Sequence, residues 1–221
     1  MSEAIADEAA ALDPFAGALT SEEELRALYE LPHERAVRKQ IDRLDEMARR
    51  LIALAPMVLV ASHAPDGAAD VSPRGGPPGF VTVLDERHLA IPDATGNRRI
   101  DTLRNVVATG HAGLLFVIPG RAQTLRVNGP ARVIARPDLL ARLQPVGKPP
   151  RSALVVEAAE VFAHCPKAFV RSRLWSPEAW PSAAEQPTSA EVSHAHMGGD
   201  AFMTVAEVEQ SERDSLRYRL A

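Results

Sequence analysis

Residues 57–92 read MVLVASHAPDGAADVSPRGGPPGFVTVLDERHLAIP, and this stretch decides the fold class. Short apolar runs alternate in it with turn residues such as Pro65-Asp66-Gly67, a pattern typical of hairpins. The strands predicted here lie at 57–61, 69–72, 80–84 and 88–92. Two hairpins in succession favour an antiparallel sheet, because parallel strands would need helices between them.

Glycine and proline are dense at 72–79, between the hairpins, and we expect the chain to leave the sheet there. The later predicted strands are 112–118, 123–128, 131–135 and one long strand over 153–164. Roughly seven short strands and about three or four helices predict a mainly β fold with flanking helices. We expect the sheet to be antiparallel and closed or nearly so.

Helical spacing of apolar residues predicts the longest helix at 34–54. Residues 1–19 are acidic and lack periodicity, so we interpret them as a mobile arm. A main domain at 20–180 and an acidic C-terminal tail at 181–221 complete the predicted organisation. The residues leave open whether the tail covers a site or is disordered.

Composition bounds the class of protein. The 221 residues are 46% hydrophobic and 24% charged, which suits one large domain, and no window approaches about 18 consecutive apolar residues. Because the N-terminus also lacks the pattern of a secretory signal, we expect a cytoplasmic protein with no membrane contact. The single cysteine, Cys165, excludes an intramolecular disulfide and a multi-cysteine zinc site.

The net charge of −4 is unevenly distributed, with −7 in residues 1–30, +8 in 31–175 and −5 in 176–221. All but three of the 25 basic residues are arginine, which suits recognition of phosphate or carboxylate. Codon bias in a GC-rich genome is an equal explanation. No nucleic-acid partner is predicted, because the basic residues are scattered and aromatic residues make up only 5% of the chain.

The strongest chemical signal is Gly96-Asn97-Arg98-Arg99, at the junction of a predicted strand and a predicted helix. A helix start presents free N–H groups and two guanidinium groups add donors, so a phosphate fits there. We expect Asn97 to cap the helix and Arg74 to complete the site. The alternative is that Arg98 and Arg99 are solvated.

Alternate polar residues mark the strand predicted at 123–128. Thr124, Arg126 and Asn128 share one face of it, and such a face can bind a heteroaromatic ring or an anion. A plain solvent-exposed face is the alternative.

Several other reactive side chains are weaker signals. Cys165 precedes a predicted helix and lies near Lys167, which favours a reactive thiol, but a buried or structural cysteine is the preferred interpretation. His194, His196 and Asp200 are residue types that can bind a metal ion, but they lie in a tail that we interpret as solvated. No metal site is therefore predicted. No catalytic residue is assigned. Four histidines have no carboxylate at a telling spacing: His63, His88, His111 and His164.

Six motifs together carry a resemblance to a known family. They are DVSPRGGPPGF at 70–80, LAIPD at 89–93, GNRR at 96–99, TLRVNG at 124–129, HCPKA at 164–168 and RSRLW at 171–175. With them the chain resembles a subgroup of the pyridoxamine 5'-phosphate oxidase-like, FMN-binding split-barrel proteins, over roughly residues 20–180. The resemblance implies a six-stranded split barrel that forms a homodimer with FMN at the subunit interface.

The resemblance also implies roles for individual residues. Asn97, Arg98 and Arg99 stand at the turn that holds the FMN phosphate in the oxidases, and Arg74 is the candidate for a further arginine on it. Other implied contacts of the flavin are Pro92 and Asp93 beside it, Thr124 and Arg126 on the strand that bonds the ring edge, and Trp175 from the partner subunit.

One departure from the oxidases bears on the reaction. Their C-terminal Arg-x-His-type segment, which binds the substrate's phosphate, has no counterpart in the C-terminal residues here, so oxidation of pyridoxamine phosphate is not expected. We expect an FMN-dependent oxidoreductase that acts on an unidentified small molecule. The alternatives are a non-catalytic flavin-binding store, sensor or carrier, and the same barrel binding heme or a deazaflavin.

Overall fold

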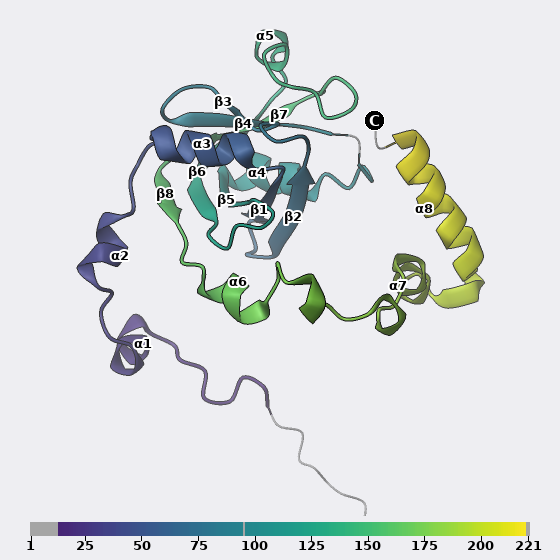
Figure 1. Cartoon of the computed structure of the whole chain (residues 1–221), viewed down its shortest axis with the longest axis horizontal. Helices are drawn as coiled ribbons and strands as arrows, with labels where there is room; N and C mark the ends of the chain where they lie inside the picture. Colours follow the sequence, from purple (N-terminus) through teal and green to yellow (C-terminus); the bar gives the residue numbers. More distant parts are fainter. Residues whose placement is uncertain (1–12, 95, 220–221) are drawn as a thin grey trace, which may run out of the picture. The chain divides into compact units, whose positions relative to one another are not determined.

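A computed structural model describes residues 13–94 and 96–219 of the chain (Figure 1). Most of the arm predicted at 1–19 lies outside these residues. The chain divides into one unit that ends at Arg38 and a second that begins at Lys39. The first unit contains α1, Glu22–Leu28, and α2, Glu34–Arg38, and neither helix has a buried residue.

The long helix predicted at 34–54 is wrong, because α2 stops at Arg38 and α3 spans Glu46–Leu54. Between them, the backbone of Ile41 exchanges two hydrogen bonds with Val161, of 2.9 and 2.8 Å, which hold it extended. Asp45 then caps α3 by accepting a 2.8 Å bond from the N–H of Ala48. The helical spacing of apolar residues therefore runs through Ile41, where the pairing with Val161 keeps the backbone extended.

The eight strands pair only antiparallel, in the order β2-β1-β5-β6-β7-β4-β3, with β8 also on β6. They are β1 Met57–His63, β2 Ala69–Gly75, β3 Thr82–Val83, β4 His88–Pro92, β5 His111–Val117, β6 Leu125–Ile134, β7 Ala153–Glu157 and β8 Glu160–Ala163. This confirms the mainly β class with flanking helices and the antiparallel split barrel. The sheet does not close, and it has eight strands instead of about six.

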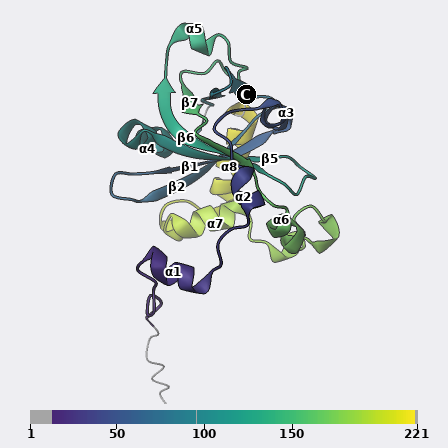
Figure 2. The ribbon, with the colours of Figure 1, turned by 90° about the vertical axis from the view of Figure 1, so that its left-hand side faces the viewer.

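Strand β6 joins the two halves of the barrel (Figure 2). Its first part pairs with β8 and its last part with β7, so the strands predicted at 123–128 and 131–135 are one continuous strand. Gly129 lies at the change of partner, where a Cβ atom would collide with the carbonyl oxygen of Glu157. Glycine is the residue that allows this close approach of two backbones.

The prediction that the chain leaves the sheet at residue 72 is also wrong, because β2 continues to Gly75 and so includes Pro73 and Arg74. Among the described strands β2 pairs only with β1, and an edge strand tolerates proline since one side needs no donor. The strand predicted at 153–164 divides into β7 and β8. The strand predicted at 80–84 shortens to β3.

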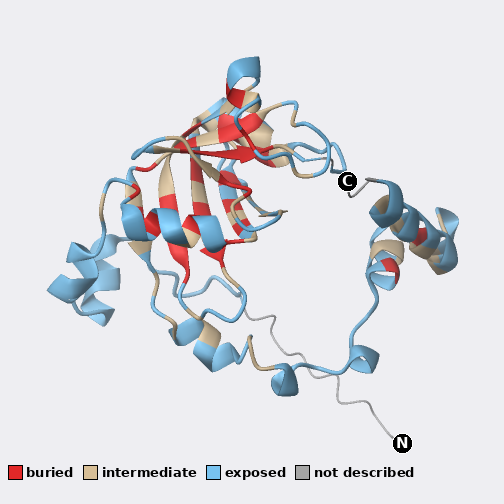
Figure 3. Ribbon diagram, turned by 45° about the horizontal axis from the view of Figure 1, so that its top comes forward, coloured by how far each residue is buried: buried red, intermediate tan, exposed pale blue. Residues whose placement is uncertain are grey.

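The core lies on the inner faces of β1, β5 and β6 and under α3 (Figure 3). Side chains alternate along β1, so that Val58 and Val60 are buried while their neighbours face outward. Phe80, Phe116 and Ile52 add the largest buried volumes. Burial of each such side chain contributes about 1.5–3 kcal/mol to folding, which makes this the main stabilising region.

The remaining helices lie in connections and after the barrel. They are α4 Asp101–Thr109, α5 Pro137–Leu140, α6 Lys167–Ser172, α7 Ser189–His196, α8 Val205–Arg219 and the short 3-10 turns Pro177–Ala179, Ala183–Glu185 and Gly199–Ala201. The segment predicted as a tail at 181–221 therefore contains two helices, and α7 packs on α8 through Ala190 and Val208. Across the described ranges, every helix is too short or too polar to traverse a bilayer.

Candidate functional site

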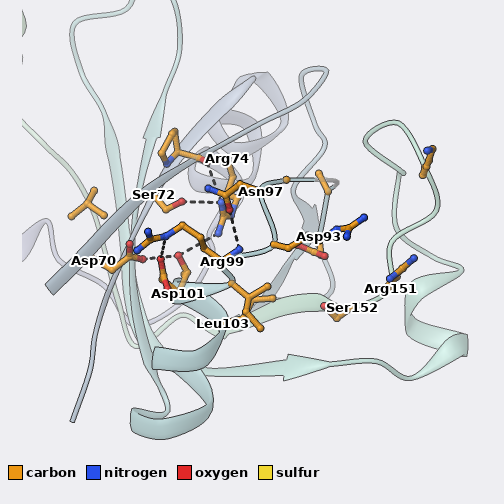
Figure 4. A pocket seen from close by; sticks show the side chains of 18 of the residues that line it. Asp70, Ser72, Arg74, Asp93, Asn97, Arg99, Asp101, Leu103, Arg151 and Ser152 are labelled. Carbon is orange, nitrogen blue, oxygen red and sulfur yellow. Dashed lines mark hydrogen bonds and ion pairs between the residues drawn. The ribbon is translucent and has the colours of Figure 1, made fainter. Parts of the chain in front are cut away.

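A pocket of about 910 Å³ opens where β2, the loop after β4, the start of α4 and the loop before β7 meet (Figure 4). Five of its lining residues are basic: Arg74, Arg98, Arg99, Lys148 and Arg151. Three are acidic: Asp70, Asp93 and Asp101. The surplus of positive charge gives the pocket an electrostatic preference for anions.

Arg74 is held in place by hydroxyl groups and not by a direct ion pair with a carboxylate. Its Nη1 donates to Ser72 Oγ at 2.8 Å, and its Nη2 donates to Thr102 Oγ1 at 3.2 Å. The buried Thr102 hydroxyl in turn donates to Asp70 at 2.6 Å. Strand β2 and helix α4 are thereby joined, and the guanidinium group keeps donors for an incoming anion.

The loop from Gly96 to Ile100 has an unusual backbone. Arg98 and Ile100 take left-handed conformations, with φ of 65° and 53°, which cost of order 1–3 kcal/mol each for residues with a side chain. The predicted helix cap at Asn97 is wrong, because α4 follows Ile100 and has no side-chain cap. Asn97 instead accepts a 3.0 Å bond from the N–H of Arg99 and shapes the loop itself.

The two loop arginines differ in availability. Arg99 donates from Nε to Asp101 at 2.8 Å, and this bond holds the pKa of Arg99 above its usual range. Arg98 has no ion pair with any residue in the described ranges. We therefore expect Arg98 to offer an anion more free positive charge than Arg99 does.

Sequence reasoning missed the loop before β7, which adds Lys148, Arg151 and Ser152 to the pocket. The β4–β7 pairing places Pro92 opposite Ala153, and the N–H of Asp93 donates to the Ser152 carbonyl at 2.9 Å. The loop before β7 is thereby brought to the pocket. Two basic residues in the run GKPPRS were the available signal, but only the strand pairing gives them a place.

Asp93 is the carboxyl whose proton affinity the pocket changes most clearly. Burial raises the pKa of Asp93, while the charges of Arg74 and Arg151 and the N–H of Ala94 oppose the rise. The folded protein therefore binds this proton more readily than an unfolded chain does. Charged Asp93 thus costs stability near neutral pH, a cost that disappears when the group is protonated.

We expect Asp93→Asn to raise the melting temperature at pH 7 but to leave it unchanged below about pH 3, where an unfolded aspartate is also mostly protonated. Thermal unfolding at the two pH values measures this difference. The control is Asp138→Asn, which removes an exposed ion pair with Arg136 and should have little effect. Equal gains for Asp93→Asn at both pH values would contradict the assignment.

Three predicted contacts of the flavin lie away from this pocket. Thr124 is buried, and Arg126 donates to Glu160 at 2.7 Å and lies 4.0 Å over the Phe162 ring, with its buried Nε unbonded. Trp175 donates from Nε1 to the Arg121 carbonyl at 3.0 Å. The pocket thus unites five of the predicted residues, with Pro92 buried beside it: Arg74, Asp93, Asn97, Arg98 and Arg99.

The other reactive side chains also have defined surroundings. Burial, followed by the charges of Arg126 and Lys39, lowers the pKa of His164. His88 Nδ1 lies 3.0 Å from Asp85, so the prediction that this histidine lacks a carboxylate partner is wrong. The preferred interpretation of Cys165 as buried is wrong as well, since it is exposed. His194 pairs with Asp200 at 2.8 Å. The described residues contain no group of three or more His, Cys, Asp or Glu side chains that could hold one metal ion.

The fold and the pocket define a class, a split-barrel protein with an arginine-lined pocket. The sequence model of the family described as pyridoxamine 5'-phosphate oxidase matches residues 44–165. The chain belongs to the pyridoxamine 5'-phosphate oxidase family. This match includes β1 to β8 and all the residues that line the pocket.

Solved structures with similarity to the chain include HupZ of Group A Streptococcus, at 16% identity and a TM-score of 0.44, covering 55% of this chain and 99% of that one. A putative pyridoxamine 5'-phosphate oxidase of Lactobacillus delbrueckii has 24% identity and a TM-score of 0.43, with coverage of 55% and 95%. HutZ, a heme storage protein of Vibrio cholerae, has 13% identity and a TM-score of 0.36, with coverage of 55% and 94%. A comparison with curated proteins finds no match.

Proposed function

We propose that the protein is an FMN-dependent oxidoreductase that acts on a small molecule, and that the pocket holds the phosphate of FMN. The observation that carries the proposal is the gathering of Arg74, Arg98 and Arg99 at the start of α4. Guanidinium groups bind phosphate oxygens in pairs, and the first N–H groups of α4 add donors there.

The residues present fit this cofactor. A volume of about 910 Å³ lies in the range of pockets that bind cofactors, roughly 300–1,000 Å³. Arg74 is already positioned by Ser72 and Thr102, so an incoming phosphate meets a preorganised donor. The left-handed residues of the loop are strained, which is typical of backbone that is shaped for a ligand.

The chain's own residues have separable tasks in this proposal. Arg74, Arg98 and Arg99 bind the phosphate, and Asn97 keeps the loop in its conformation. Asp93, the carboxyl with the raised pKa, stands at a position that the family resemblance places beside the flavin, and there it can hold a proton. When bound, the flavin itself supplies the exchange of hydride or electrons.

We further propose a homodimer with FMN at the subunit interface. The side of β1, β2 and β5 that faces away from the core is apolar. It bears Met57, Leu59, Val71 and Leu115. Such faces are typical of subunit interfaces. Sedimentation equilibrium should give the mass of two chains, and a single species with the mass of one chain would contradict the proposal.

Absorbance of the purified protein, with chromatography of what it releases on denaturation, tests the cofactor. Release of FMN is expected. A released heme or deazaflavin would support the same barrel with another cofactor, and a colourless protein that also fails to bind added FMN would contradict the proposal. Loss of flavin colour on addition of a reduced nicotinamide, followed by its return with an acceptor, would distinguish an oxidoreductase from a store, sensor or carrier.

A further inference from the structure

Two histidines lie at the ends of neighbouring strands and line one pocket. The pairing of β1 with β5 ends at Ala61 opposite Gly113, and His63 and His111 lie two residues beyond that pair on their strands. Both histidines are exposed and stand on the side of the sheet that faces away from the core.

A second pocket, of about 500 Å³, is lined by this pair of histidines. Ala61 and Gly113, the next residues on the same face, have little or no side chain and leave space beside the rings. Asn128 and Glu160 line the pocket as well, but they bond one another at 2.8 Å, and Glu160 also pairs with Arg126 at 2.7 Å. Within the described residues the Nε2 atoms of both histidines make no bond, whereas both interactions of Glu160 use its Oε1.

The ring nitrogens of the two histidines are set in the same way. Nδ1 of His63 lies 3.0 Å from the carbonyl oxygen of Ala64, and Nδ1 of His111 lies 3.1 Å from that of Thr109. A carbonyl oxygen only accepts, so these contacts favour the tautomer of the neutral ring that has the proton on Nδ1 and the lone pair on Nε2. Histidines that ligate metals typically donate their other N–H to a backbone carbonyl or carboxylate in this manner.

We propose that His63 and His111 form a binding site for one divalent transition-metal ion of the kind that imidazole prefers, such as Zn²⁺, Ni²⁺ or Cu²⁺. Their Nε2 atoms are the two protein ligands. Water completes the coordination, because the described residues contain no group of three or more His, Cys, Asp or Glu side chains that could hold one ion. Both ligands belong to one chain and lie outside the arginine-lined pocket, on the same outward face of β1 and β5 as the proposed subunit interface.

Calorimetric titration of the full-length protein with ZnCl₂, and separately with NiCl₂, tests the proposal. We expect about one ion bound per chain. His63→Ala and His111→Ala should each weaken binding by about tenfold or more, since loss of even an outer partner of a metal ligand costs about 10–100-fold. The exposed positions of both residues at strand ends allow each variant to fold, which circular dichroism checks.

The matched control is His88→Ala, because His88 also has its Nδ1 engaged, by Asp85, but stands in a different hairpin. Its binding constant should equal that of the unaltered protein. Absence of binding by the unaltered protein would overturn the proposal. Equal affinities of the His63→Ala and His111→Ala variants and the unaltered protein would also overturn it. A loss seen only on replacing His194 would overturn it by assigning the ion to the His194–Asp200 pair.

Discussion

Replacement of Arg98 and Arg99 together by alanine is expected to weaken FMN binding by about a hundredfold or more, while riboflavin binding changes by less than about threefold. A hydrogen bond to a charged group is worth about 1.5–3 kcal/mol, and about 1.4 kcal/mol is a factor of ten in affinity. Two such bonds lost give at least a hundredfold. Because Arg99 also donates to Asp101, we expect the loss of FMN affinity to lie at the low end, near a hundredfold.

Riboflavin is the decisive comparison, because it has the same ring system as FMN and lacks the phosphate. Fluorescence quenching measures both dissociation constants. Arg49→Ala with Arg50→Ala is the matched control, an adjacent exposed arginine pair on α3 outside the pocket, and it should leave FMN binding unchanged. Equal losses of FMN and riboflavin in the Arg98 and Arg99 variant would show that these residues act on the fold or the ring and not on the phosphate.

The largest effect on stability is expected from Gly129→Ala. The added Cβ atom would collide with the Glu157 carbonyl oxygen and would also stand 3.1 Å from the Ala159 nitrogen. Both are backbone atoms of the β7–β8 junction, and the junction cannot move without breaking the pairing of β6 with both strands. We expect a loss of about 3 kcal/mol, which for a chain of this length lowers the melting temperature by about 6–12 °C.

Gly75→Ala is the control for this change. It adds the same methyl group to a strand, but there the nearest atom, the Pro56 carbonyl oxygen, would be 3.5 Å away, an ordinary van der Waals contact. Its melting temperature should stay close to that of the unaltered protein. A Gly129→Ala protein with an unaltered melting temperature would show that the junction yields to the side chain and that β6 does not require glycine at its bend.

Local patterns predicted the strands of the barrel better than its helices. Alternating burial and turn residues are properties of short segments, and they located both hairpins, β1–β2 and β3–β4. The helix at 34–54 failed because its apolar spacing continues through Ile41, whose extended backbone depends on Val161, a residue 120 positions away along the chain. The prediction of two separate strands at 123–128 and 131–135 failed for the same reason. The two partners that follow β6 in the chain, β7 and β8, pair with its two ends.

The candidate site shows the same division. Gly96-Asn97-Arg98-Arg99 was identified from residue type and from its place between a strand and a helix, and the structure sets it beside Arg74, as predicted. The role of Asn97 was not predicted correctly, because a cap and a loop bond are both consistent with asparagine before a helix. Lys148 and Arg151 were missed because nothing in their own segment relates them to β4.

The amino-acid sequence alone was sufficient to predict the class of fold, the two successive hairpins and the arginine motif. Each of these depends on residues that are neighbours within a few positions. Tertiary structure alone decided that β2 carries Arg74 to the start of α4, that β7 brings Arg151 to Asp93, and that His63 and His111 line one pocket. These juxtapositions depend on strand register, and register is set by the packing of the whole sheet, because a slip of one residue would turn every side chain to the other face.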